Sequence, residues 1–61
     1  MIRIETHKGD AFVRPGEVVL IEPAEDGGCT VHVELTSYIH FVVSTEDPVD
    51  IALRVKGERS D

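Results

Sequence analysis

The residues best suited to chemistry in this chain are two histidines, a glutamate and one cysteine. His32, Glu34 and His40 fall on two predicted strands, at positions that share one face of a sheet when side chains alternate. Imidazole and carboxylate are ligands that zinc prefers. Cys29, however, is an odd number of positions from His32, so the two side chains point to opposite faces of a strand. The pattern therefore predicts a solvated polar contact face at His32, Glu34 and His40, without a metal ion or other cofactor.

The remaining candidates for catalysis have local structural explanations. Cys29 has no basic neighbour in sequence that would activate its thiol, which favours a structural role. The Gly27-Gly28 pair lacks the spacing and the following helix of a phosphate-binding loop. The acidic pairs 25–26 and 46–47 fall in a predicted turn and at a predicted helix start. The sequence therefore predicts that the chain is not an enzyme and has no catalytic residues.

The overall charge restricts the classes of partner. Six lysines and arginines stand against twelve acidic residues, which gives a net charge of −6 in 61 residues. Because nonspecific nucleic-acid binding depends on clustered cations, this balance argues against direct contact with DNA or RNA. The longest apolar run, at 18–21, is far shorter than the roughly 20 residues of a membrane span. With a single cysteine and no signal-peptide pattern, the expected location is the cytoplasm.

Acidic residues gather at two predicted chain reversals. One group surrounds the loop after the third strand and the other precedes the helix, and together they comprise Glu22, Glu25, Asp26, Glu46 and Asp47. If both reversals lie at the same end of the sheet, these carboxylates form an acidic patch. Such a patch would suit a basic protein partner.

Hydropathy patterning indicates a mainly β, α+β fold. Alternation and β-branched residues predict five short strands at 2–7, 11–14, 18–22, 29–35 and 38–44. Thr45-Glu46-Asp47-Pro48 is typical of a helix start, and Gly57 of a helix end. The predicted architecture is a small, antiparallel, twisted five-stranded sheet with one short C-terminal helix. It forms a single domain over 1–56, followed by a polar, disordered tail at 57–61.

Two hairpin registers follow from the same pattern. The pair Gly9-Asp10 predicts a two-residue turn between the first strands, because glycine tolerates positive φ. In the last hairpin, Ile39, Phe41 and Val43 are expected to face inward together with Val31, Val33 and Leu35. Paired residue numbers would then sum to 74 or to 72, and the sequence leaves both registers open.

The apolar run of the third strand points to assembly. Val18, Val19, Leu20 and Ile21 do not alternate with polar residues, which is typical of a strand that is covered on both faces. One short helix covers at most one face of so small a sheet. These four residues therefore form the predicted interface of a homo-oligomer, made by sheet-edge pairing or by sheet stacking.

The order of elements resembles the FlbD family of small flagellar and swarming-motility proteins. The resemblance spans about residues 1–56, through the opening Met1-Ile2-Arg3-Ile4, the hairpin Lys8-Gly9-Asp10, the strand at 18–22, the acidic turn at 25–27, the strands at 30–35 and 39–43, and the helix start Thr45-Glu46-Asp47. It implies the same fold and a bacterial regulatory or motility-associated setting. The family has no assigned catalytic residues to carry over.

The function predicted from the sequence is a non-enzymatic protein–protein interaction module that acts as a homo-oligomer. The alternative is an acidic inhibitor or sequestering protein encoded by a phage or mobile element. It would imitate nucleic acid with aligned carboxylates, or capture a small anion between subunits where Arg3, Arg14 or Arg54 converge.

Overall fold

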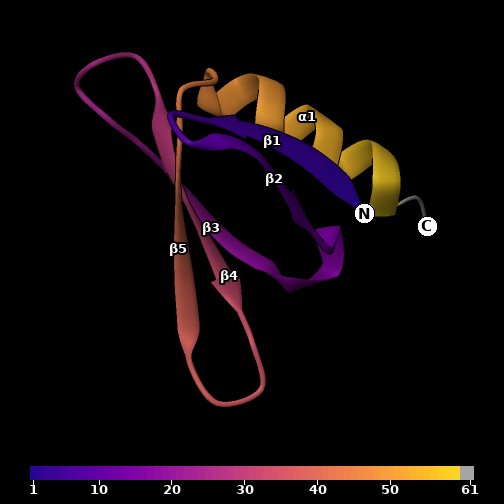
Figure 1. Ribbon diagram of the computed structural model, residues 1–61. Helices are drawn as coiled ribbons and strands as arrows, with labels where there is room; N and C mark the ends of the chain where they lie inside the picture. The colour runs from indigo at the N-terminus through magenta and orange to yellow at the C-terminus, as the bar shows by residue number, and fades with distance from the viewer. Residues whose placement is uncertain (60–61) are drawn as a thin grey trace.

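The computed structural model describes residues 1–59 and shows the predicted fold, with five antiparallel strands in one sheet and a C-terminal helix (Figure 1). The strands are ordered β2-β1-β5-β4-β3. The elements in chain order are β1 (Ile2–Thr6), β2 (Gly9–Val13), the 3-10 helix η1 (Pro15–Glu17), β3 (Val18–Pro23), β4 (Cys29–Glu34), β5 (Ile39–Ser44) and α1 (Pro48–Arg59).

The sheet consists of two parts that are joined at one point. The β1–β2 hairpin lies beside α1, whereas β4 and β5 extend away from the helix as a long arm (Figure 1). Between β1 and β5 the register contains a single pair, Thr6↔Ser44. The core lies between α1 and the inner face of the sheet, and it comprises Ile2, Ile4, Val13, Val18, Cys29, Val31, Val33, Val42, Ile51 and Val55.

The first hairpin turns two residues earlier than the sequence predicts. Strand pairing runs to Thr6↔Gly9, so the loop residues are His7 and Lys8. The Thr6 hydroxyl accepts a hydrogen bond from the Lys8 N–H (3.1 Å) and donates one to the Gly9 carbonyl (2.7 Å). Gly9 has φ +115° directly after the loop. The predicted turn at Gly9-Asp10 is wrong, because the threonine hydroxyl closes the turn before the glycine.

The last hairpin takes neither predicted register. Val31 pairs with Val42 and His32 with Phe41, so the paired residue numbers sum to an odd value. The Leu35 N–H donates to the Tyr38 carbonyl (2.8 Å), which closes a loop of two residues. Because the turn fixes the register, every odd-numbered inward position of β4 meets an even-numbered residue of β5. The predicted inward set Ile39, Phe41 and Val43 therefore lies on the outer face, away from α1.

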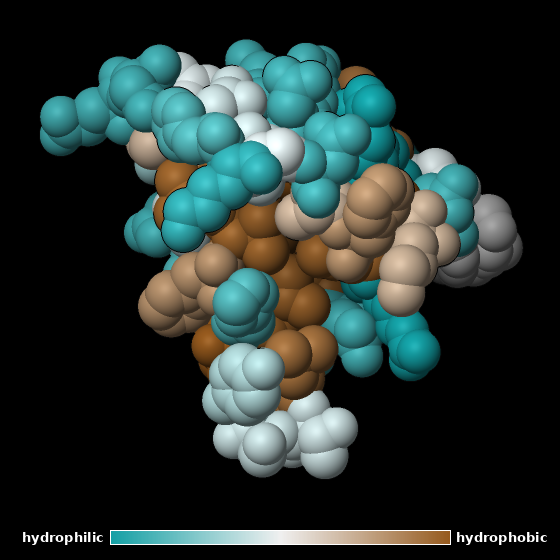
Figure 2. All heavy atoms as spheres, viewed as in Figure 1, coloured by the Kyte–Doolittle hydropathy of each residue, from teal (hydrophilic) through white to brown (hydrophobic). Residues whose placement is uncertain are grey.

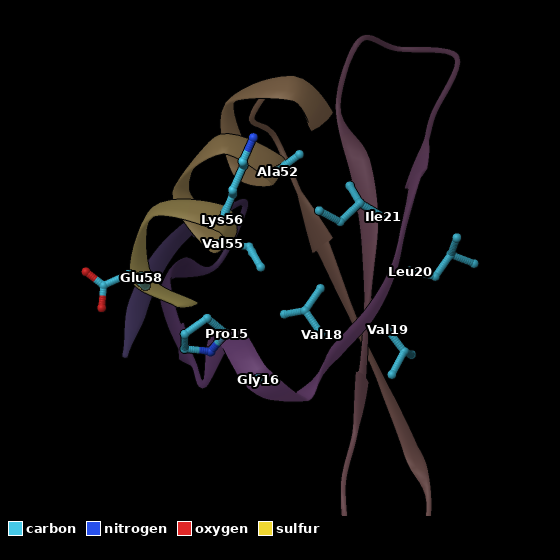
Figure 3. A pocket seen from close by; sticks show the side chains of 10 residues that line it. All are labelled: Pro15, Gly16, Val18, Val19, Leu20, Ile21, Ala52, Val55, Lys56 and Glu58. Carbon is cyan, nitrogen blue, oxygen red and sulfur yellow. The ribbon is translucent and has the colours of Figure 1, made fainter. Parts of the chain in front are cut away.

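A β-bulge explains the unbroken apolar run of β3. The register shifts between Val18↔Val33 and Leu20↔His32, so Val19 is an extra residue. Val18 and Ile21 point toward α1, whereas Leu20 points away on the other side of the strand (Figure 3). The run therefore does not require cover on both faces of β3.

Helix α1 begins where the sequence predicts and continues further. The Asp47 carboxylate accepts a hydrogen bond from the Val49 N–H (2.8 Å), and Pro48 occupies the first turn. The helix passes through Gly57 to Arg59, so the predicted end at Gly57 is wrong. Residues 60–61 of the predicted tail lie outside the described residues.

Candidate functional site

The most distinctive surface is the outer face of β3, β4 and β5, the face opposite α1. Two rows of neighbours cross it, Leu20–His32–Phe41 and Glu22–Thr30–Val43. Four apolar side chains on it are about half exposed, and they are Leu20, Ile39, Phe41 and Val43. We call these four the apolar cluster. Figure 2 shows further apolar surface, between the arm and the hydrophilic region around the helix.

His32 lies between two members of the apolar cluster, Leu20 and Phe41. Its ring meets that of Phe41 edge-on, with centroids 4.7 Å apart and an interplanar angle of 62°. Its Nε2 atom lies 3.4 Å from Glu22 Oε1, and the side chain is 18 % exposed. The imidazole thus connects Leu20 to Phe41 and offers little free polar surface.

The predicted polar face of His32, Glu34 and His40 is wrong. His40 pairs with Val33 and lies on the inner side of the arm, while His32 and Glu34 lie on the outer face. The His40 ring is near Tyr38, with centroids 6.4 Å apart. Across residues 1–59, no group of three or more histidine, cysteine or acidic side chains is placed to hold a metal ion.

Cys29 is a buried free thiol in the core. Burial raises the pKa of the thiol, and the nearby Glu46 and Asp47 carboxylates raise it further. A hydrogen bond with Ser44 acts in the opposite direction. The environment of Cys29 therefore favours the protonated, unreactive form.

Over residues 39–43, the edge of β5 that faces away from β4 is open. In an antiparallel ladder, successive residues bond alternately to one side and to the other. The Leu35–Tyr38 bond sets the even-numbered residues of β5 toward β4, and the bond from the Thr45 N–H to the Glu5 carbonyl sets the odd-numbered ones toward β1. Because β1 pairs only at Thr6↔Ser44, the backbone groups of Ile39 and Phe41 face a side from which β1 has diverged.

An open cleft lies along this edge. It has a volume of about 380 Å³ and separates β5 from the β1–β2 hairpin. The hairpin side is lined by Thr6, His7, Lys8 and Ala11, and the β5 side by residues 40–43. There is therefore space beside the unpaired backbone of β5.

The Ser44 end of β5 is closed by polar side chains. The Glu46 carboxylate accepts hydrogen bonds from the Glu5 N–H (2.8 Å) and from Arg54 Nη1 (3.0 Å) and Nη2 (2.8 Å). Arg54 Nη1 also donates to the Arg3 carbonyl (2.7 Å), and the Ser44 hydroxyl donates to the Glu5 carbonyl (2.8 Å). Hydrogen bonding to Arg54 and to the Glu5 backbone lowers the pKa of Glu46 to about 2.

This network removes Glu46 from the predicted acidic patch. The pair Cys29↔Ser44 does place both acidic reversals at the same end of the sheet. Glu46 is nevertheless occupied by Arg54, and Asp47 caps α1. In the loop after β3, Asp26 accepts a hydrogen bond from the Gly28 N–H (3.0 Å). Glu25 is exposed in that loop and Glu22 is exposed beside His32, so Glu46 alone of the five predicted residues is withdrawn from the surface.

The predicted interface residues of β3 divide between core and surface. Val18 is buried and Ile21 packs against the core, while Val19 and Leu20 are about half exposed. An open groove of about 910 Å³ runs between β3 and α1, with Val55 and Lys56 among the residues lining its helix side (Figure 3). Of the predicted run, only Val19 and Leu20 retain substantial exposed surface for a contact.

The arginines proposed to capture an anion do not converge within one chain. Arg54 forms an ion pair with Glu46. Arg3 Nη1 lies 3.5 Å from Asp10 Oδ2 on the exposed β1–β2 hairpin. Arg14 is exposed just before η1. Two of the three guanidinium groups therefore already have a carboxylate partner.

Sequence reasoning missed the open edge of β5 and the exposure of Ile39, Phe41 and Val43. The signal lay in the polar pair Thr36-Ser37, which is the loop of a tight hairpin. Taking this pair as the loop gives the observed odd register directly. It would have placed all three apolar residues outside.

Comparisons of this chain with protein-family models, with curated proteins and with solved structures find no match. Within the described residues, no helix combines the length and apolarity needed to cross a membrane.

Proposed function

We propose that this chain is a non-enzymatic protein–protein interaction module that acts as a homo-oligomer. The observation that supports the proposal is the apolar cluster of Leu20, Ile39, Phe41 and Val43, all about half exposed. Three of the four lie on β5, whose edge opposite β4 pairs within the described residues only at Ser44. Exposed apolar strands with open edges associate unless charges or bulges protect them. The regulatory or motility setting implied by the FlbD resemblance stays a prediction.

A second copy is the occupant that suits this surface. Segment 39–43 of β5 contains no charged residue, so it matches another uncharged apolar strand. The acidic loop at 24–28 and the carboxylates at 46–47 lie at the other end of the arm, away from Ile39. A standard interface takes about 800 Å² from each partner. That is just under a fifth of the 4318 Å² surface of this chain.

The test is the solution mass of three proteins, measured by light scattering over a concentration series. The wild-type chain is expected to exceed the 6.7 kDa of a monomer. Phe41→Glu should shift it to the monomer, because a carboxylate replaces a ring that is 59 % exposed in the apolar cluster. Leu53→Glu is the matched control, since Leu53 is 63 % exposed on α1, outside the cluster.

A monomeric wild-type chain at all concentrations would overturn the proposal. So would a Phe41→Glu variant that keeps the wild-type mass. Circular dichroism establishes that each variant is folded, and Val43→Glu provides a second disruption of the cluster should Phe41→Glu fail to fold.

A further inference from the structure

We infer that two copies join through antiparallel pairing of β5 with β5 of the partner subunit, about a two-fold axis at Phe41. This inference rests on the proposed function, because it specifies how the homo-oligomer forms. Over residues 39–43 the sheet would continue from one chain into the next as β3-β4-β5-β5-β4-β3, while β1 remains beside Ser44. The backbone, the side chains and the charges each support this arrangement.

The backbone of β5 supplies the hydrogen-bonding groups. Ile39 and Phe41 direct their N–H and C=O groups to the side where β1 has diverged. An antiparallel partner centred on Phe41 takes up these groups in closely spaced pairs. The cleft beside residues 40–43 provides the entry for the partner strand.

The side chains of β5 are self-complementary about Phe41. A two-fold axis there places Phe41 opposite its own equivalent and Ile39 opposite Val43 of the partner subunit. Cross-strand aromatic and β-branched pairs each stabilise a sheet by roughly 0.2–1 kcal/mol relative to Ala–Ala. On the inner side, His40 would face Val42 of the partner subunit. No pair in this register sets like charges against each other.

The charge distribution favours the antiparallel orientation. The acidic residues of the β3–β4 loop and of 46–47 lie beyond the Ser44 end of β5. Antiparallel pairing sends the two Ser44 ends in opposite directions, which separates these carboxylates. A parallel arrangement would place both sets side by side in a chain whose net charge is −6.

Edge pairing differs from face-to-face stacking in the position of Leu20. In stacking, Leu20 and Phe41 both lie in the contact, because the row Leu20–His32–Phe41 crosses the outer face. In edge pairing, Phe41 lies at the junction, while Leu20 lies two strands away on β3. Leu20 is 51 % exposed and Phe41 is 59 % exposed, so the effects of replacing each by glutamate can be compared directly.

The experiment compares the dissociation constants of Leu20→Glu and Phe41→Glu, obtained from light scattering. Edge pairing predicts at least a roughly hundredfold weakening for Phe41→Glu, which brings two carboxylates together, against less than about threefold for Leu20→Glu. A mixed sample of isotope-labelled and unlabelled wild-type chains then gives the register. Nuclear Overhauser contacts are expected between Ile39 and Val43 of different copies.

Similar weakening by both substitutions, with no Ile39–Val43 contact between copies, would overturn edge pairing and leave the homo-oligomer intact. A wild-type chain that is monomeric at every concentration would overturn the proposed function and this inference together. An oligomer with intercopy contacts at α1 in place of β5 would also refute the edge pairing.

Discussion

The two ends of β5 differ in how the backbone groups on the side facing β1 are satisfied. At the Ser44 end, where β1 and β5 meet in a single pair, the side chains of Ser44, Glu46 and Arg54 complete the hydrogen bonding of the adjacent backbone. At the Ile39 end, β5 has diverged from β1, and the described residues show no strand on the side of β5 opposite β4. Both ends interrupt the sheet, but only the first is closed within one chain.

The difference shows which part of the sheet edge is completed within one chain and which part needs a second strand. Polar side chains can replace a strand ladder over a short gap, provided that each donor and acceptor finds a partner. An apolar strand without charged residues has no such means, and it remains an edge until another strand covers it. Variants at the Ser44 end should therefore alter the stability of the monomer, whereas variants at the Ile39 end should alter association.

The largest expected effect on stability is that of Arg54→Met. The variant leaves the Glu46 carboxylate, only 19 % exposed, without its guanidinium partner, and leaves the Arg3 carbonyl without its donor. Because the pair is only partly buried, we expect a loss of about 2–3 kcal/mol in the free energy of unfolding, to which the lost ion pair and the unpaired carbonyl both contribute. Urea titration in the Phe41→Glu background measures this without a contribution from self-association.

Lys56→Met is the matched control for this substitution, since it removes an exposed cation from the same helix. It should change the free energy of unfolding by less than about 0.5 kcal/mol. Equal losses from the two variants would show that the network at the Ser44 end contributes nothing beyond its charge.

The second effect concerns the close packing of Gly28 against the same end of β5. A Cβ atom at Gly28 would overlap the Ser44 carbonyl oxygen, whereas one at Gly16 would meet open space. Gly28→Ala is expected to destabilise the chain by about 2 kcal/mol, because backbone must move to relieve the overlap. Urea titration of Gly28→Ala beside Gly16→Ala checks this, and comparable midpoints would contradict the close packing.

A third effect is the acid dependence of stability. The folded-state pKa of Glu46 is about 2, below its ordinary value of 4.5, so its contribution is complete above pH 4.5 and is lost as pH falls toward 2. With Arg54 partly exposed and screened by solvent, we expect about 1–2 kcal/mol from this group. Glu46→Gln should flatten the curve of unfolding free energy between pH 5 and about 2. An unchanged slope would assign the dependence to other carboxylates.

The smallest effect in this series is that of Asp47→Ala. The variant removes the carboxylate that accepts the Val49 N–H at the start of α1. A lost cap of this kind costs about 1 kcal/mol, and Asp47→Asn should restore most of it. If Asp47→Ala instead left the unfolding midpoint unchanged, the residue would be free to serve a partner, as the acidic-patch prediction requires.

The sequence predicted the strands and the helix, but not the registers that decide which side chains are exposed. Alternation and β-branched residues placed five strands and a terminal helix, and the structure confirms that architecture. The registers failed because each depends on a local turn. The Thr6 hydroxyl closes the first hairpin early, and Thr36-Ser37 shifts the last by one residue. A shift of one residue moves a whole side-chain set to the other face.

The same shift decided the candidate site. It separated His40 from His32 and Glu34, and it exposed Ile39, Phe41 and Val43. The acidic-patch prediction failed at Glu46 for a different reason. Arg54 lies eight residues later in sequence, and its contact with Glu46 depends on how α1 packs against β1. Neither composition nor periodicity carries that information.

The most direct test of the open edge is amide hydrogen exchange of β5 in the wild-type chain, measured at low and at high concentration. The Val42 N–H faces β4 and should be protected in both samples. Edge pairing predicts that the Ile39 and Phe41 N–H groups exchange at least about tenfold more slowly at the concentration where the solution mass doubles. Unchanged, rapid exchange of both amides in the oligomer would contradict the pairing of β5 with a second copy.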